Sequence, residues 1–287
     1  MYLEIIGVVV VCFVCIISFF RSRTKKVEKS EQIKGGLNLL SYIQKIMALL
    51  QQHRGTSNAV LQGNNKLKPR LQSLQTNLDK LIHEGEILDI KSFPQWESFT
   101  EHWPRLKRRC LNGELEPSNL IRQHNIMIDG HLSLLDDITS YYDLNSLKLD
   151  NFHHVSGLCL DVLRVVEIIA QARGLGAGAC AKGECSRVDQ IALNFIKTSI
   201  SSRTNELFNE LNTIDNTKLS ENLSTSSRTI KVGVDKLEYA ISTQVLVEKT
   251  TINASDYFNL ASKPIDDLLD IFNEVILYAS QKYTSKV

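Results

Sequence analysis

The sequence predicts an all-α protein, in which an N-terminal transmembrane helix is followed by two up-and-down four-helix bundles. Three observations lead to this fold class. Only 5 of the 287 residues are proline, and Leu, Ile, Lys, Glu, Asn and Ser recur in long unbroken stretches, as is typical of helical proteins. Apolar residues recur at intervals of three and four along most of the chain. No segment shows the period-two alternation and hairpin turns that predict paired strands.

The first twenty residues predict a membrane anchor. Residues Ile5 to Phe20 carry no charge, and some 20 apolar residues suffice to cross a bilayer core of about 30 Å. Glu4 stands where a cleaved signal peptide would carry basic residues, so we expect the anchor to be retained. Four basic residues follow within 21–26, and this charge bias predicts that the rest of the chain faces the cytoplasm. The expected location is the inner cell membrane, with a single span.

The remaining chain divides into a short connector and one large helical domain. Residues 1–26 form the expected transmembrane anchor and basic stop, 27–38 a polar linker that contains Gly35 and Gly36, and 39–285 one all-helical domain. Leucines at threes and fours from Leu67 to Leu81 are typical of a bundle helix. The predicted helices cover residues 37–61, 67–81, 96–110, 117–142, a segment that contains Arg173, and then 186–215, 224–249 and 254–284.

Two arginines occupy positions where a bundle helix normally carries apolar residues. Arg54 and Arg173 each follow apolar residues at helical spacing, and each is followed by a glycine, Gly55 and Gly174. The second segment repeats the pattern of the first at a constant offset of 119 residues. A guanidinium does not lose its charge, so burial requires an anionic partner or several acceptors.

The residues alone leave two interpretations of these arginines open. In the structural interpretation they form internal salt bridges. Asp161 and Glu167 sit about 120° around the helix axis from Arg173, so a protein partner for Arg173 must come from another helix. In the functional interpretation the two planar guanidinium groups bind one small planar oxyanion through charge-assisted hydrogen bonds.

Several other functions find no support in the sequence. With 33 basic and 32 acidic side chains the chain has no net field for nucleic acid, so no nucleic-acid partner is expected. The glycine-rich run RGLGAGACAKG lacks the preceding strand and the Lys-Ser or Lys-Thr of a phosphate loop. The adjacent His153 and His154 point in different directions on a helix, and no metal site, cofactor or catalytic residue is predicted. The sequence leaves open whether Cys180 and Cys185 form a disulfide or stay reduced.

An ordered set of segments carries a family resemblance. HRGTSNAVLQGN, WESFTEHWPRL, DDITSYYDLNSLKLD, ARGLGAG and DYFNLASKPIDDL together resemble the nitrate/nitrite-sensing (NIT) domain over residues 39–283. The resemblance implies two four-helix bundles that bind nitrate or nitrite between them through arginines. Arg54, Gly55, Arg173 and Gly174 fall on its two arginine-glycine motifs, and His53 stands where some members carry a second arginine. Further ligand arginines cannot be placed by motif, and the candidates are Arg187, Arg203 and Arg228.

The resulting expectation is a membrane-anchored sensory domain without enzymatic activity. It would bind nitrate or nitrite through Arg54, Arg173, Gly55, Gly174 and His53, and signal to a separate, unidentified output protein. A homodimer is left open as a further partner. The alternative from another class is a helical, membrane-tethered interaction scaffold that binds no ligand.

Overall fold

The computed structural model describes residues 2–216 and 219–284, without the side chains of residues 2–12 and 14. The α-helices are α1 (Tyr2–Leu61), α2 (Lys68–Gly85), α3 (Pro94–Asn112), α4 (Pro117–Tyr141), α5 (Val155–Lys182), α6 (Arg187–Thr213), α7 (Ser220–Ala240) and α8 (Ala254–Thr284). Short helical turns lie at Asn65–Leu67, Asp89–Ser92, Leu144–Ser146 and Ile241–Val245. Within these described ranges the only strand-like pairing is an isolated bridge between Lys148 and His154, so the all-α prediction is confirmed.

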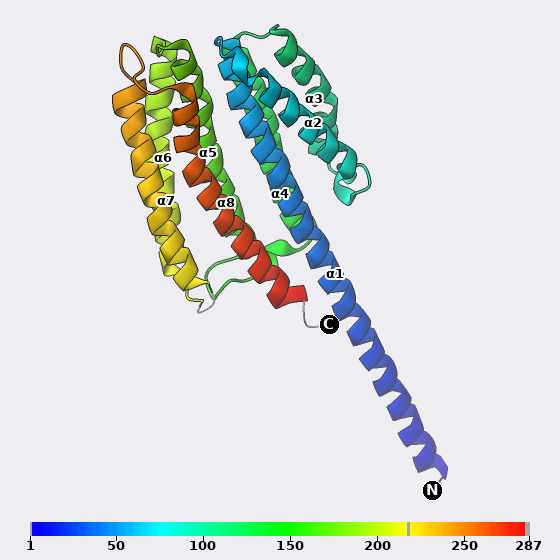
Figure 1. Ribbon diagram of the computed structural model, residues 1–287. Coiled ribbons are helices and arrows are strands. Elements are labelled where there is room, and N and C mark those ends of the chain that lie inside the picture. The colour runs from blue at the N-terminus through cyan, green and yellow to red at the C-terminus, as the bar shows by residue number, and fades with distance from the viewer. Residues whose placement is uncertain (1, 217–218, 285–287) are drawn as a thin grey trace.

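The helices form two groups that meet along α1, α5 and α8. Figure 1 shows α1 to α4 on one side and α5 to α8 on the other, with the N-terminal half of α1 projecting beyond both groups. Helix α5 packs against α6 and α8 in its own group and against α1 of the other, while α1 also contacts α2, α4 and α8. Helices α1 and α5 run side by side in the same direction, which matches the internal repeat in the sequence.

Proline and glycine mark several helix ends. Pro94 and Pro117 occupy the first turns of α3 and α4, where the missing N–H would have no helical acceptor in any case. Gly113 and Gly183 follow α3 and α5 with φ of 68° and 83°, the left-handed conformation that ends a helix most readily at glycine. These positions explain why the helix boundaries were largely predictable from the sequence.

The linker expected at residues 27–38 is not a separate segment. These residues continue α1 without interruption. A Cβ atom on Gly36 would lie 2.6 Å from the Cβ of Tyr142, so the glycine lets α1 pack directly on the end of α4 rather than breaking the helix. Burial of Ile33 and Leu37 on the same face stabilises the helix beyond the roughly 1 kcal/mol that each glycine costs.

The predicted membrane location is corrected by the structure. Most of the expected span, residues 5–12 and 14, has side chains outside the described part. Among the described residues, no helix is both long enough and apolar enough to cross a bilayer. The prediction of a single-pass inner-membrane protein is therefore wrong on this finding.

Candidate functional site

Helices α1 and α5 approach each other most closely at the two glycines of the repeated motif. A Cβ atom built on Gly55 would lie 3.6 Å from the Cα of Gly174, and one built on Gly174 would lie 3.8 Å from the Cα of Gly55. Equivalent residues of the repeat thus face each other. Because neither carries a side chain, the adjacent Arg54 and Arg173 are held where the two helix groups meet.

Arg54 is fully buried and neutralised by a carboxylate of α5. Its Nη1 lies 2.7 Å from Oε1 of Glu167 and its Nη2 lies 3.2 Å from Oε2, a two-pronged ion pair. Nη1 also donates to Oδ1 of Asn125 on α4 at 2.6 Å. The Glu167 carboxylate further accepts hydrogen bonds from Gln51 and Gln171, at 3.0 and 2.8 Å. The guanidinium of Arg54 is therefore engaged by the protein itself.

Arg173 is buried just as deeply but has no such partner. Its Nη1 donates to the Ser262 hydroxyl of α8 at 3.0 Å, and its guanidinium lies 4.7 Å from the ring centre of Phe258. Its buried Nε, like that of Arg54, has no hydrogen-bond acceptor, and no carboxylate of the described residues lies within ion-pair distance, although the negative charge of Asp266 on α8 acts on it. Burial, followed by the nearby charge of Arg54, lowers the pKa of Arg173 to about 10.

The internal repeat explains why the two arginines differ. The residue 119 positions before Glu167 is Ala48, so the first half of the chain offers no carboxylate to Arg173 at the equivalent place. Likewise Gln51, which helps to hold Glu167, corresponds to Ala170. The repeat therefore contains one arginine with its carboxylate, Arg54 with Glu167, and one arginine whose repeat-related partner is missing.

A second guanidinium and a small cavity lie beside Phe258. Arg70 of α2 stands 4.7 Å from the centre of the same ring. Arg70, Thr56, Ser255 and Phe258 are among the residues that line a cavity of about 40 Å³ between α1, α5 and α8. Thr56 is 2% exposed, and a space of this size holds a few water molecules or one small ion.

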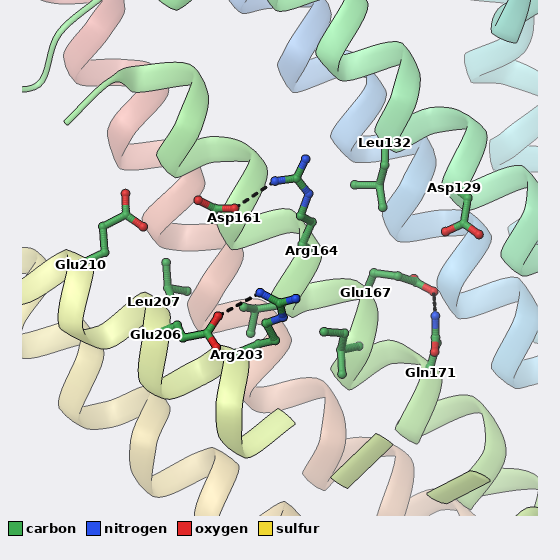
Figure 2. A pocket seen from close by; sticks show the side chains of 12 residues that line it. Asp129, Leu132, Asp161, Arg164, Glu167, Gln171, Arg203, Glu206, Leu207 and Glu210 are labelled. Carbon is green, nitrogen blue, oxygen red and sulfur yellow. Dashed lines mark hydrogen bonds and ion pairs between the residues drawn. The ribbon is translucent and has the colours of Figure 1, made fainter. Parts of the chain in front are cut away.

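A larger groove runs along the opposite side of the α1–α5 contact. Figure 2 shows Glu167 and Gln171 at one end of this groove of about 560 Å³, between α4, α5 and α6. Its charged lining comprises five carboxylates but only two guanidinium groups, those of Arg164 and Arg203, and each of these pairs with a neighbouring carboxylate. An anion is disfavoured in this acidic groove, which leaves the Arg173 side as the anion-compatible part of the contact.

The structure separates the predicted site residues into two places. Arg54, Gly55, Arg173 and Gly174 meet at the α1–α5 contact, whereas His53 points into the core of α1–α4. There its Nδ1 lies 2.7 Å from Nε2 of His124. Consecutive helical residues point about 100° apart, so His53 and Arg54 cannot serve one small site.

The additional candidate arginines do not complete the site. Arg203 pairs with Glu206 on the surface of α6, and Arg187 and Arg228 are exposed. The residues that do surround Arg173 were not identified from sequence, namely Arg70, Phe258 and Ser262. Phe258 and Ser262 lie on α8, within the segment DYFNLASKPIDDL that carries part of the resemblance, but no local spacing links that segment, or Arg70 of α2, to Arg173.

Comparison with known proteins adds one structural neighbour. No protein-family model matches the chain, and no curated protein matches it either. The structure of the NasR transcription antiterminator aligns with a TM-score of 0.70 and 14% sequence identity, over 95% of this chain and 75% of that chain. The two proteins share a fold. NasR is named as a regulator of transcription rather than as an enzyme.

Proposed function

We propose that the chain is a helical sensor domain that binds a small planar oxyanion, nitrate or nitrite first, at Arg173. One observation carries the proposal: Arg173 is a buried guanidinium without a carboxylate partner among the described residues. A buried guanidinium that no carboxylate contacts directly is costly, and an anion from solution would reduce that cost. The shared fold with NasR and the resemblance to the nitrate/nitrite-sensing family are consistent with this function.

The Arg54–Glu167 pair indicates which ligand suits Arg173. A carboxylate is planar, carries one negative charge and presents two oxygens to the two prongs of a guanidinium. Nitrate and nitrite share these three properties. Sulfate is tetrahedral and doubly charged, and chloride can accept hydrogen bonds but not in a planar two-pronged manner. We therefore expect nitrate and nitrite to bind more tightly than sulfate and chloride.

This proposal revises the site expected from the sequence. The sequence suggested that Arg54 and Arg173 hold one anion together. In the structure the two Nη groups of Arg54 already donate hydrogen bonds to Glu167. The proposed contacts to the anion therefore come from Arg173 and Ser262, and Arg70 adds positive charge beside Phe258. Arg54 then contributes through its charge, and through its place at the contact between α1 and α5.

Signalling would follow from the position of the site. Arg173 lies on α5, Ser262 on α8, and Gly55 of α1 packs against Gly174. An anion bound there favours one packing of these helices over others, and only such differential binding transmits a signal. The output protein remains the partner to be identified, and a second copy of the chain is one candidate.

A ligand-free interaction scaffold is the second candidate function. The Arg54–Glu167 pair favours it, because this pair shows that the fold can satisfy a buried arginine with its own carboxylate. Under this interpretation Arg173 is held by Ser262 and Phe258 alone. Binding of a partner protein would then proceed without any anion.

Isothermal titration of the purified chain with nitrate, nitrite, sulfate and chloride separates the two functions. We expect saturable binding of nitrate or nitrite that Arg173→Ala weakens by roughly ten- to a hundredfold, the effect of losing a charge-assisted hydrogen bond of about 1.5–3 kcal/mol. The matched control is Arg203→Ala, an arginine of the acidic groove. Absence of heat with every anion, and identical melting curves with and without nitrate, would leave the scaffold as the better description.

A further inference from the structure

The first helix group contains a buried cluster to which each of its four helices contributes a side chain. His53 comes from α1, Gln75 from α2, Cys110 from α3 and His124 from α4. The candidate ligand atoms of His53, Cys110 and His124 all lie within 4.8 Å of one another, and all three residues are buried. Residues 53, 110 and 124 are far apart in sequence, so only the packing of α1, α3 and α4 brings them together.

The hydrogen bonds of the cluster orient one imidazole for coordination. Nδ1 of His124 lies 2.8 Å from the backbone oxygen of Leu120, to which it donates its proton. The lone pair of His124 is therefore on Nε2, which faces Nδ1 of His53 at 2.7 Å. A ring N–H bonded to a backbone carbonyl is the usual support of a histidine that binds a metal.

Burial disfavours charge on the three candidate ligand side chains. It keeps the pKa of His53 and His124 well below the usual range and raises the pKa of the Cys110 thiol to about 12, although a hydrogen bond between Cys110 and Ser57 opposes the shift of the thiol.

We propose that His53, Cys110 and His124 bind one Cu(I) ion in a three-coordinate site. Cu(I) replaces the thiol proton of Cys110, so one Cu–S bond forms, one S–H bond breaks, and the proton leaves to solvent without any change of oxidation state. Thiolate and imidazole are ligands that select Cu(I). The resulting unit of one thiolate, two neutral imidazoles and Cu(I) carries no net charge, whereas Zn²⁺ would leave one positive charge buried and would lack a fourth ligand.

Occupation of the site requires the two imidazoles to move apart. With metal–nitrogen distances of about 2.0 Å, two ligand nitrogens at a trigonal ion lie about 3.5 Å apart. The two imidazoles, now with nitrogens 2.7 Å apart, must separate by slightly less than 1 Å. His53 would then carry its proton on Nε2, and rotation of the Gln75 amide, whose nitrogen is 3.0 Å away, would offer its oxygen as acceptor.

The test is copper retention by the whole chain. The protein is refolded from urea without oxygen in the presence of Cu(I), so that entry to a buried site does not limit loading, and is then challenged with the Cu(I) chelator bicinchoninate. We expect one copper per chain, with an X-ray absorption spectrum that contains one sulfur and two nitrogen ligands. Cys110→Ala should retain at least tenfold less copper. The matched control Cys159→Ala removes a buried thiol of α5 and should retain the full amount.

Circular dichroism of each variant distinguishes loss of the site from loss of the fold. If Cys110→Ala unfolds, His124→Gln, which keeps a polar side chain of similar length, provides the same comparison. Equal copper in the parent and in a folded site variant would overturn the proposal. So would a spectrum with more than one sulfur ligand, or retention of Zn²⁺ in preference to Cu(I). Nitrate binding at Arg173 is measured separately, so the failure of one proposal leaves the other standing.

Discussion

Arg54 of α1 and Glu167 of α5 form a buried ion pair across the contact between the two helix groups, with Nη1–Oε1 and Nη2–Oε2 distances of 2.7 and 3.2 Å. Its repeat-related counterpart, Arg173, is also buried and followed by a glycine, but no carboxylate of the described residues lies within ion-pair distance of it. The two halves of the chain therefore provide an internal comparison between an arginine that is paired directly with a carboxylate and one that is not.

The two arginines should respond differently to removal. Arg54→Ala leaves Glu167 buried and unpaired, and loss of one partner of a buried pair typically costs about 3–5 kcal/mol. Arg173→Ala removes a cation that no carboxylate of the described residues contacts directly, so the unfolding free energy without anion should change by less than about 1 kcal/mol or should rise. Urea denaturation of both variants in anion-poor buffer measures the contrast. Equal destabilisation would mean that Arg173 has a protein counter-charge.

An internal carboxylate beside Arg173 should abolish anion binding. Ser262 already lies 3.0 Å from Nη1 of Arg173, so the carboxylate of Ser262→Asp can occupy the position proposed for nitrate. We expect nitrate affinity to fall by at least tenfold, without loss of stability in anion-free buffer. Ser262→Asn is the matched control, because it adds similar bulk without charge. Unchanged nitrate titration of Ser262→Asp would place the anion elsewhere.

Much of the fold was predictable from sequence, because apolar spacing, proline and glycine act locally. The C-terminal ends of α1 and α3 lie close to the predicted positions, and the repeat located both arginines on buried faces. The partners of those arginines depend on packing between helices. Glu167 was correctly excluded as a partner of Arg173, but its pairing with Arg54 follows only from the alignment of α1 with α5.

The surroundings of His53 and the continuity of α1 likewise depend on contacts between distant segments, which the sequence does not reveal. His53 shares the sequence motif with Arg54, yet its neighbours are His124 and Cys110, which lie 71 and 57 residues further along the chain. No local pattern joins these three residues. Gly35 and Gly36 suggested a break in the chain, because the sequence does not reveal that Tyr142 packs against them.

Alanine substitutions at two helical glycines, one tightly packed and one in open space, should change stability in opposite directions. A Cβ on Gly176 would lie 2.3 Å from ring atoms of the buried Tyr257, so Gly176→Ala should cost about 1–3 kcal/mol. Gly130, inside α4, has no atom within 4 Å of such a Cβ. Gly130→Ala should stabilise the protein by about 0.5–1 kcal/mol, because alanine is the better helix former. Thermal melts of the two variants measure whether stability falls in the first and rises in the second.

Buried His131 predicts a loss of stability in acid. Burial lowers its pKa to about 4, although its Nδ1, 2.7 Å from the backbone oxygen of Met127, opposes that shift. The unfolded chain, with an ordinary histidine pKa near 6.5, then binds more protons than the folded chain at any pH between about 6.5 and 4. The stability contributed by this residue is complete above that window and falls as the pH decreases through it, by up to about 1.4 kcal/mol per pH unit.

Urea denaturation of His131→Gln, which cannot titrate, should show a shallower pH dependence than the parent in this window. His83→Gln, at an exposed position, should follow the parent. If His131→Gln retains the full slope, the acid sensitivity belongs to other groups.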